Sequence, residues 1–297
     1  MRYAAIDIGS NAVRLLISDV VEKEKHVDFL KTVFIRVPIR LGTDAFSDDK
    51  SISDESLVEL EKAMQAFYNL IDVFKVVEYR ACATAAMREA INSQEVVNYI
   101  AAKTGVSIEV VDGKEEAGLI HTIHVAETLE ANKTYMYIDV GGGSTEITLF
   151  SNNRIVASSS FPVGTIRMLL GADLEPVWNN LQHWLSMHAI NRKDIIGIGT
   201  GGNINKIAKM IGKKESKAIT RNDIKSVYSF LSGFSYDERV SVLGLNPDRA
   251  DVILPASKIF LNITKMAGIN EMYVPKLGLV DGVVHALYEK NLVPKQV

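Results

Sequence analysis

Two stretches of the chain carry the same alternation of apolar and polar positions. The segments YAAIDIGSNAVRLLI (residues 3–17) and YMYIDVGGGSTEITL (residues 135–149) align without a gap. In each, an apolar run ends in an aspartate, small residues follow, and a second run alternates apolar with polar positions, which is typical of two strands joined by a tight turn. Asp7 aligns with Asp139, 132 residues later (139 − 7). The pattern predicts a duplicated β-hairpin and therefore a chain with two related halves.

Helical periodicity follows each hairpin. Residues 53–74 begin with a serine that can cap a helix and continue with an apolar stripe of helical spacing, and residues 93–105 end a second such pattern at a glycine. Further helices are predicted from residue 114 onward and around Trp178 and Trp184. Short apolar runs predict additional buried strands at residues 76–84, 107–112, 154–161 and 271–274. Strands and helices alternating in both halves predict an α/β fold.

Composition and charge narrow the class of protein. The 297 residues are 47% hydrophobic and 23% charged, as in a globular protein with a substantial core. A formal net charge of −3 gives no general attraction to nucleic acid or to an anionic membrane. Cys82 is the single cysteine, which excludes an intrachain disulfide, and no signal peptide or membrane-spanning apolar run is recognisable. We therefore expect a cytoplasmic protein that binds neither nucleic acid nor membrane.

The turn of each hairpin consists of residues that can bind phosphate. Glycine lets backbone N–H groups approach an anion closely, and three consecutive glycines precede Ser144 in the second turn. An aspartate at the end of the preceding strand can hold a hydrated cation beside the phosphate. A single hairpin of this kind could equally be a tight turn without a ligand. The duplication at half-chain spacing favours a pair of phosphate-binding loops.

Eight short motifs of recognisable type follow one another along the chain. The first four are DIGSNAVR (7–14), ATAAMREA (83–90), GKEEA (113–117) and DVGGGSTE (139–146). The other four are PVGTIR (162–167), GTGG (199–202), DRADVILPA (248–256) and GLVDG (278–282). Together they make the chain resemble the exopolyphosphatase and guanosine pentaphosphate phosphatase (Ppx/GppA) family. The two hairpins also resemble the phosphate loops of the wider actin, sugar-kinase and Hsp70 superfamily.

The resemblance implies a fold and a division into domains. The expected architecture is α/β, with two actin-like (ribonuclease H-like) domains whose mixed sheets face each other across a central cleft. The first domain would comprise residues 1–119 and a C-terminal helix at about residues 283–297, and the second would comprise residues 120–282. Each domain would contribute one phosphate loop.

Hydrolysis of a terminal phosphoanhydride is the activity that the resemblance implies. The substrate would be inorganic polyphosphate or pppGpp, and orthophosphate would be released with the help of Mg²⁺ or another divalent cation. The expected binding partners are polyphosphate or guanosine penta- or tetraphosphate. By resemblance Glu116 is the base that activates water, and the metal ligands are Asp139, Glu146 and Asp7. The expected phosphate-binding residues are Ser10, Asn11, Arg14, Thr84, Arg88, Gly141, Gly142, Gly143 and Ser144.

Two departures from the family pattern bear on this expectation. Gly118 stands where the family usually carries arginine, so a cationic contact near Glu116 would be missing. The sequence contains no His-Asp dipeptide, so we do not expect the metal-hydrolase domain with which long family members end. Binding of long polymers would then require a homodimer or would not occur.

Other functions stay open at the level of the sequence. A kinase or ATPase of the same superfamily would use the same two loops, and a protein that only binds polyphosphate or (p)ppGpp would be consistent with Gly118. Cys82 and Arg88 also match the Cys-x5-Arg pattern of thiol phosphatases. No glycine lies between them, so we expect Cys82 to be a buried strand residue.

Overall fold

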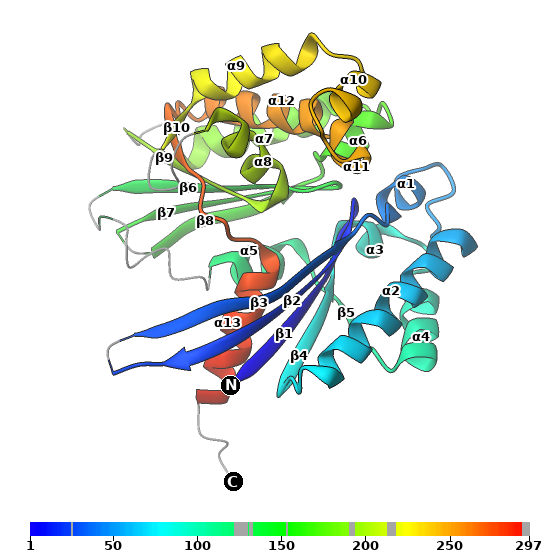
Figure 1. Ribbon diagram of the computed structural model, residues 1–297. Coiled ribbons are helices and arrows are strands. Elements are labelled where there is room, and N and C mark those ends of the chain that lie inside the picture. Colours follow the sequence, from blue (N-terminus) through cyan, green and yellow to red (C-terminus); the bar gives the residue numbers. More distant parts are fainter. Residues whose placement is uncertain are drawn as a thin grey trace. The chain divides into compact units, whose positions relative to one another are not determined.

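The chain divides into two compact units (Figure 1). Unit 1 comprises Met1–Ile123 and Leu279–Val297, and unit 2 comprises His124–Gly278. The domain boundaries expected at residues 119 and 282 stay a prediction. Residues 293–297 of the expected C-terminal helix lie outside the described residues. The computed structural model describes residues 1–24, 26–121, 130, 133–152, 154–189, 194–212 and 218–292.

Unit 1 contains a five-stranded mixed sheet in the order β3-β2-β1-β4-β5. Strand β2 is antiparallel to both β1 and β3, whereas β1 pairs with β4 and β4 pairs with β5 in parallel. The first hairpin and the two strands predicted after it are thus confirmed. The strands span Arg2–Ile8 (β1), Val13–Glu22 (β2), Val27–Val37 (β3), Glu78–Ala83 (β4) and Ile108–Val110 (β5).

Strand β3 is not among the strands predicted from the sequence, and it contains a β-bulge. Its register with β2 shifts between Ile17 and Ser18, which face Val33 and Lys31. The extra residue turns the odd-numbered positions of β3 from one face of the sheet to the other. Apolar residues before the bulge pack in one core of unit 1 and those after it pack in the other: Val27 and Phe29 before, and Val33, Ile35 and Val37 after.

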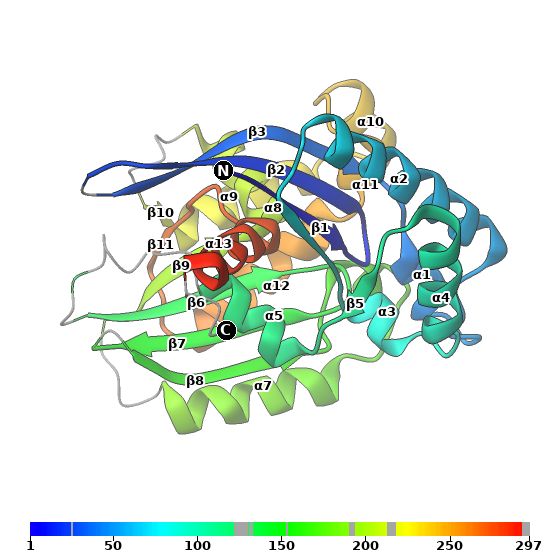
Figure 2. The same cartoon turned by 90° about the horizontal axis from the view of Figure 1, so that it is seen from below.

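Helices cover both faces of the unit 1 sheet. Helices α2 (Asp54–Val73) and α4 (Ser93–Thr104) lie side by side on one face (Figure 2). Helices α5 (Gly113–His121) and α13 (Leu279–Leu292) contact each other on the opposite face. Residues of β1 alternate between the two cores, as the period of a strand requires. Unit 1 is therefore a three-layer α/β/α structure.

Helix ends in unit 1 follow signals in the sequence. Ser53 caps α2 by accepting a hydrogen bond from the backbone N–H of Ser56. Gly105 ends α4 with a φ of 75°, a conformation that glycine adopts without strain. Two five-residue helices, α1 (Leu41–Ala45) and α3 (Ala85–Glu89), contact each other close to the turn of the first hairpin. These short helices bring later parts of the chain to the first loop.

Unit 2 contains a six-stranded mixed sheet in the order β10-β11-β9-β6-β7-β8. The second hairpin is confirmed as β6 and β7, and β9 pairs with β6 in parallel. The two-residue strand β10 was too short to show any periodicity. The strands span Thr134–Val140 (β6), Thr145–Ser151 (β7), Arg154–Phe161 (β8), Ile196–Thr200 (β9), Ile219–Thr220 (β10) and Glu271–Tyr273 (β11).

The core of unit 2 lies between its sheet and four helices. Met136 and Ile138 of β6 pack with residues of α7, α8, α9 and α12, while Tyr135 and Tyr137, which alternate with them, form a separate small cluster. In the described ranges no helix has the length and apolar character needed to cross a membrane. The helices are α6 (Thr165–Leu169), α7 (Glu175–His188), α8 (Gly201–Ile211), α9 (Arg221–Ser232), α10 (Tyr236–Ser241), α11 (Pro247–Ala250) and α12 (Ile253–Met266).

The two hairpins share one register. Asp7 faces Arg14 across β1 and β2, and Asp139 faces Glu146 across β6 and β7 at positions 132 residues later. In both units a parallel strand, β4 or β9, then pairs with the first strand of the hairpin. The duplication predicted from the sequence is therefore confirmed at the level of strand order and register.

Candidate functional site

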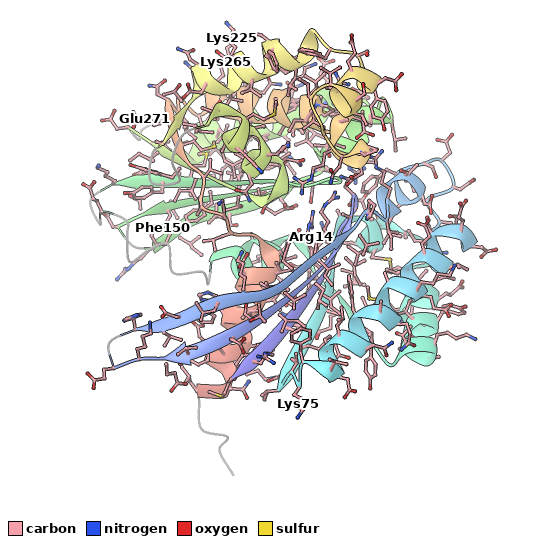
Figure 3. All side chains as sticks on the ribbon, in the orientation of Figure 1. Arg14, Lys75, Phe150, Lys225, Lys265 and Glu271 are labelled. Carbon is pink, nitrogen blue, oxygen red and sulfur yellow. The ribbon has the colours of Figure 1, made fainter. Side chains whose placement is uncertain are left out.

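Asp7 and Arg14 form an ion pair at the end of the unit 1 sheet. Arg14 lies where the first hairpin turns (Figure 3), and its Nη1 contacts Oδ2 of Asp7. The Asp7 side chain is almost fully buried, and a buried carboxylate is costly unless a cation or hydrogen bonds compensate it. Arg14 provides this compensation. A metal ion at Asp7 would therefore compete with the guanidinium, so the role of Asp7 as a metal ligand stays a prediction.

The predicted phosphate-binding residues Ser10 and Asn11 lie in the turn between β1 and β2. Ser10 is only 3% exposed, and its Oγ has no hydrogen-bond partner among the described residues. Its carbonyl oxygen accepts a hydrogen bond from the N–H of Gly42, at 2.8 Å. Oδ1 of Asn11 accepts one from Nε of Arg40, at 2.9 Å. Arg40 was not identified from the sequence, because a single arginine in a loop carries no local signal of its contacts.

Glu116, the predicted base, lies in the first turn of α5. The carboxylate of Asp112 caps this helix by accepting hydrogen bonds from the N–H groups of Lys114 and Glu115, at 2.8 Å each. These backbone hydrogen bonds, with the nearby charge of Arg88, lower the pKa of Asp112. The cap fixes the start of the helix and thereby the direction in which the Glu116 side chain extends.

The structure distinguishes Glu116 from its neighbour Glu115. Glu116 is 9% exposed, and Nη1 of Arg88 lies 3.5 Å from its Oε2. Glu115 is exposed and pairs with Arg80 at 2.6 Å. A guanidinium beside a carboxylate favours the negatively charged form, which is the form that a general base needs. Of the two acids, Glu116 has the surroundings of a functional group.

The other predicted residues of this region, Thr84 and Arg88, belong to the segment where β4 ends and α3 begins. Thr84 is buried, and its N–H donates to the carbonyl of Ile8 at 3.1 Å. Besides contacting Glu116, Nη1 of Arg88 donates to the carbonyl of Val111 at 2.8 Å. Arg88 thus connects the end of β5 to the predicted base. Binding of phosphate by Thr84 and Arg88 stays a prediction.

Cys82 does not have the properties of a thiol nucleophile. It lies in β4 with a fully buried side chain, as the sequence predicts. Burial raises the pKa of the thiol to about 12, so the thiolate needed for nucleophilic attack is scarce at neutral pH. The Cys-x5-Arg pattern is therefore coincidental.

The second loop carries two carboxylates that face each other. Oε1 of Glu146 accepts hydrogen bonds from the hydroxyls of Ser144, at 2.7 Å, and Ser160, at 2.8 Å. Oδ2 of Asp139 accepts one from the hydroxyl of Thr200, at 2.9 Å. The two predicted metal ligands of this unit are thus oriented by hydroxyl groups. Ser160 and Thr200 were not identified from the sequence, because strand pairing brings them to these acids.

The glycine turn of the second loop is held by the segment PVGTIR. The carbonyl of Gly141 accepts a hydrogen bond from the N–H of Thr165 at 3.1 Å, and the carbonyl of Gly142 accepts one from the N–H of Ile166 at 2.8 Å. The carbonyl of Gly143 accepts one from Nε of Arg167 at 2.7 Å. Across a trans peptide, each N–H points opposite to the preceding carbonyl. The N–H groups of Gly142, Gly143 and Ser144 therefore point away from this segment, as a phosphate cradle requires.

Close packing makes glycine necessary in the supporting segment. A side chain on Gly164 would overlap the carbonyl group of Gly142. The N–H of Gly141 donates to the carbonyl of Ser144 at 2.9 Å and closes the turn, so it is not directed at a ligand in the way that its three neighbours are.

The oxygen ligands of unit 2 fit a hard divalent cation. Within the part of the chain that the structure describes, no group of three His, Cys, Asp or Glu residues is close enough to hold a metal ion. Asp139 and Glu146 nevertheless face each other in register. Mg²⁺ typically uses one or two carboxylates and completes its shell with phosphate oxygens and water. Two carboxylates are therefore sufficient for Mg²⁺ bound together with a phosphorylated substrate.

The third glycine-rich segment, GTGG, packs against the second loop. A side chain on Gly201, whose φ is 86°, would lie 2.6 Å from Oδ1 of Asp139. Nη1 of Arg249 donates to the carbonyl of Gly202 at 3.0 Å. Lys206, one helical turn further along α8, has a lowered pKa because of desolvation and the nearby charges of Lys209 and Arg249. This group of cations was not identified from the sequence.

Two related mixed sheets, each with a duplicated hairpin whose first strand pairs in parallel with a later strand, define the two-domain fold of the actin-like ATPases. Within this class, the Ppx/GppA phosphatase family model matches residues 20–172 and 174–291, and the chain belongs to this family.

Relatives and solved structures agree with this assignment. Exopolyphosphatase 2 of Mycobacterium tuberculosis is 27% identical over 327 residues, which cover 96% of this chain and 98% of that protein. The guanosine-5′-triphosphate,3′-diphosphate pyrophosphatase of Vibrio parahaemolyticus is 22% identical, over 97% of this chain and 59% of that protein.

The structure of the Aquifex aeolicus member of the Ppx/GppA family has a TM-score of 0.75 with 25% identity, covering 98% of both chains. An exopolyphosphatase structure from Cytophaga hutchinsonii has the same fold, with a TM-score of 0.80 at 22% identity and 98% coverage of both chains.

Proposed function

We propose that this protein hydrolyses the terminal phosphoanhydride of inorganic polyphosphate or pppGpp and releases orthophosphate. The observation that carries the proposal is the buried Glu116 beside Arg88, at the capped start of α5. Membership of the Ppx/GppA phosphatase family supports this proposal. Relatives named as an exopolyphosphatase and a guanosine pentaphosphate pyrophosphatase indicate the two substrates.

Unit 1 would supply the base and most of the positive charge. Glu116 would accept a proton from the attacking water, while Arg88 and Arg14 would offset the negative charge of the phosphoryl group. Arginine suits this task because its planar fork of donors matches two phosphate oxygens. The hydroxyl of Ser10 and the amide of Asn11 would donate hydrogen bonds to the same group.

Unit 2 would supply the metal ligands and a cradle of N–H groups. Asp139 and Glu146 would hold Mg²⁺, which adds positive charge beside the phosphate oxygens when it is bound. The N–H groups of Gly142, Gly143 and Ser144 would donate to further phosphate oxygens. The chemistry needs a positioned base and charge neutralisation more than a covalent intermediate.

Two adjacent acids provide a matched pair of variants for testing this function. We expect Glu116→Gln to lower phosphate release from polyphosphate or pppGpp by about a hundredfold or more, because the base is removed while the shape of the side chain is retained. Glu115→Gln changes an exposed residue in the same turn of the helix. Phosphate release by this variant should stay within about threefold of the wild type. Measurements with and without Mg²⁺ complete the experiment.

The result distinguishes hydrolysis from the alternatives. Equal release by the wild type and Glu116→Gln would contradict the assignment of the base. Turnover that requires ATP or ADP would indicate a kinase or ATPase. Binding of either substrate without release of orthophosphate would indicate a binding protein, which is the alternative that Gly118 keeps open.

A further inference from the structure

The segment around α1 packs directly on the first phosphate loop. The N–H of Gly42 donates to the carbonyl of Ser10 at 2.8 Å. A Cβ on Gly42 would lie 2.9 Å from both Cβ and the carbonyl oxygen of Ser10, and 2.9 Å from the ring of Phe46. Contact this close is possible only for glycine. The packing therefore fixes the backbone of residues 40–42 against the loop and holds Arg40 next to it.

Arg40 determines which way the amide of Asn11 is turned. Its Nε lies 2.9 Å from Oδ1 of Asn11. A guanidinium has only donors, so the amide atom that faces it must be the oxygen and not the nitrogen. The NH₂ group of Asn11 is then on the side of the amide that faces away from Arg40. A phosphate oxygen can only accept, so this orientation is the one that phosphate binding needs.

The neighbouring residue provides an independent indication that the loop binds a polar ligand. Ser10 is buried, and within the described part of the chain its hydroxyl oxygen has no hydrogen-bond partner. Buried hydroxyl groups almost always have a partner, because desolvation without one is costly. An oxygen-rich anion at this loop would accept the hydroxyl hydrogen of Ser10 and an N–H of Asn11.

We propose that Arg40 is a positioning residue for the substrate phosphate. It binds Oδ1 of Asn11, presents the amide N–H groups to a phosphate oxygen, and keeps Asn11 from turning its oxygen toward the anion. The inference rests on the proposed function, in which the first loop binds a phosphate group. It adds a residue outside the loop and gives that residue a role in binding rather than in proton transfer.

A double-mutant cycle on the full chain tests the inference. The affinity for tripolyphosphate is measured by titration calorimetry, which does not require turnover, and KM and kcat are measured separately by phosphate release. We expect Arg40→Met to weaken binding and raise KM by about tenfold, the size of one well-placed hydrogen bond, with kcat changed less than about threefold. In an Asn11→Ala background, Arg40→Met should change affinity by less than about twofold, because its effect acts through Asn11.

Three further variants exclude a purely structural role. Asn11→Asp keeps the acceptor for Arg40 but has no N–H, so it should retain thermal stability and still lose binding. Arg40→Lys keeps one donor and should recover part of the affinity. Arg2→Met removes a guanidinium that pairs with Asp19 at the opposite end of β1, and it should leave affinity within about twofold.

The outcomes separate the inference from the proposed function. If Arg40→Met weakens the affinity for tripolyphosphate by the same factor with Asn11 and with Ala at position 11, the positioning role is overturned. Full affinity in Asn11→Asp would overturn it as well. A wild type that binds tripolyphosphate but releases no phosphate from any substrate would overturn the proposed function alone, and the cycle of affinities would still decide the inference. A wild type that does not bind tripolyphosphate would overturn the inference.

Discussion

The two hairpins have the same backbone but opposite charges at one position. In unit 1 Asp7 faces Arg14, and in unit 2 Asp139 faces Glu146. The first carboxylate is neutralised by a guanidinium, whereas the second is placed beside another carboxylate and receives a hydrogen bond from Thr200. Duplication has thus retained the register, while the side chain opposite the aspartate has the opposite charge in the two hairpins.

The comparison explains why a cation is expected at one loop. Like charges directly opposite each other on paired strands destabilise a sheet. Hydroxyl donors such as Ser144 and Ser160 reduce this cost at Glu146. A divalent cation shared by the two carboxylates would make their proximity favourable. The three metal ligands expected from the family resemblance therefore fall into a pair, Asp139 and Glu146, and a third residue, Asp7, that is already bound to arginine.

Both loops are supported in the same way by a later segment. In unit 1 the segment is Arg40 to Gly42, and in unit 2 it is Gly164 to Arg167. Each uses a glycine to reach the loop closely and an arginine to bind it. Arg40 binds the side-chain amide of Asn11, whereas Arg167 binds a backbone carbonyl. The first loop would therefore present side-chain donors and the second would present backbone N–H groups.

The largest effect should come from copying the charge of the second hairpin into the first. Arg14→Glu places a second acid opposite the buried Asp7, and breaking a buried pair costs about 3–5 kcal/mol. Phosphate release should fall by about a hundredfold or more if Arg14 binds the phosphoryl group as proposed, because an anion would then replace this cation. Urea unfolding and phosphate release measure the two effects.

Arg2→Glu is the matched control for Arg14→Glu, because Arg2 faces Asp19 across the same two strands at their other end. Both side chains of that pair are about one-third exposed, so the loss should be no more than about 1 kcal/mol, with activity retained. Equal losses in the two variants would mean that the charge of the first loop has no special role.

A smaller effect should come from removing one carboxylate of the second loop. Asp139→Asn replaces a charged ligand by a neutral amide, so the Mg²⁺ concentration needed for half-maximal turnover should rise by about tenfold or more. Asp7→Asn is the control from the first loop. It should lower stability by removing the negative charge that pairs with Arg14, and it should leave the Mg²⁺ requirement unchanged. A similar shift in both variants would show that the two hairpins bind metal alike.

Changing the support of the second loop should have a more moderate effect. A methyl group at Gly164 overlaps the carbonyl of Gly142, so Gly164→Ala should shift the glycine turn and cost about 1–3 kcal/mol. Affinity for tripolyphosphate should fall with it, as measured by calorimetry. Gly118→Ala is the control, because nothing lies within 4 Å of a Cβ built there. Unchanged affinity in Gly164→Ala would mean that the turn does not bind phosphate through its backbone.

The fold was largely predictable from local patterns. The two hairpins are visible because each combines alternating apolar positions with an aspartate and a small-residue turn. The order of elements then follows from helix caps such as Ser53 and Gly105. The sequence did not reveal that the apolar residues of β3 pack in two different cores, because the bulge near Thr32 that turns them to opposite faces is a feature of strand pairing.

The site was predictable only where the motif itself carries the chemistry. Glu116 was chosen over Glu115 by resemblance to a family, and burial supplies the physical difference between them. Arg40, Arg167 and Thr200 were not chosen, because their partners are remote in the sequence. A lone arginine or threonine has the same local pattern whether it faces solvent or a loop, so only the tertiary structure reveals these contacts.

The smallest effect concerns Gly118, where the family usually carries arginine. The sequence predicts a missing cation near Glu116, but residues two apart on a helix do not face each other. Glu116 is buried, whereas Gly118 is exposed. We therefore expect Gly118→Arg to lower KM for polyphosphate by less than about threefold, since a charge on the exposed side of α5 is screened by solvent.

The same substitution should have a clearer effect on stability. Glycine inside a helix costs about 1 kcal/mol relative to alanine, so Gly118→Arg and Gly118→Ala should both raise Tm by about 2–4 °C. Comparing these two variants separates charge from helix propensity, because only the arginine can change KM. A tenfold or larger fall in KM for Gly118→Arg alone would show that the side chain reaches the substrate from this position. The loss of arginine would then explain weaker binding of polyphosphate by this protein.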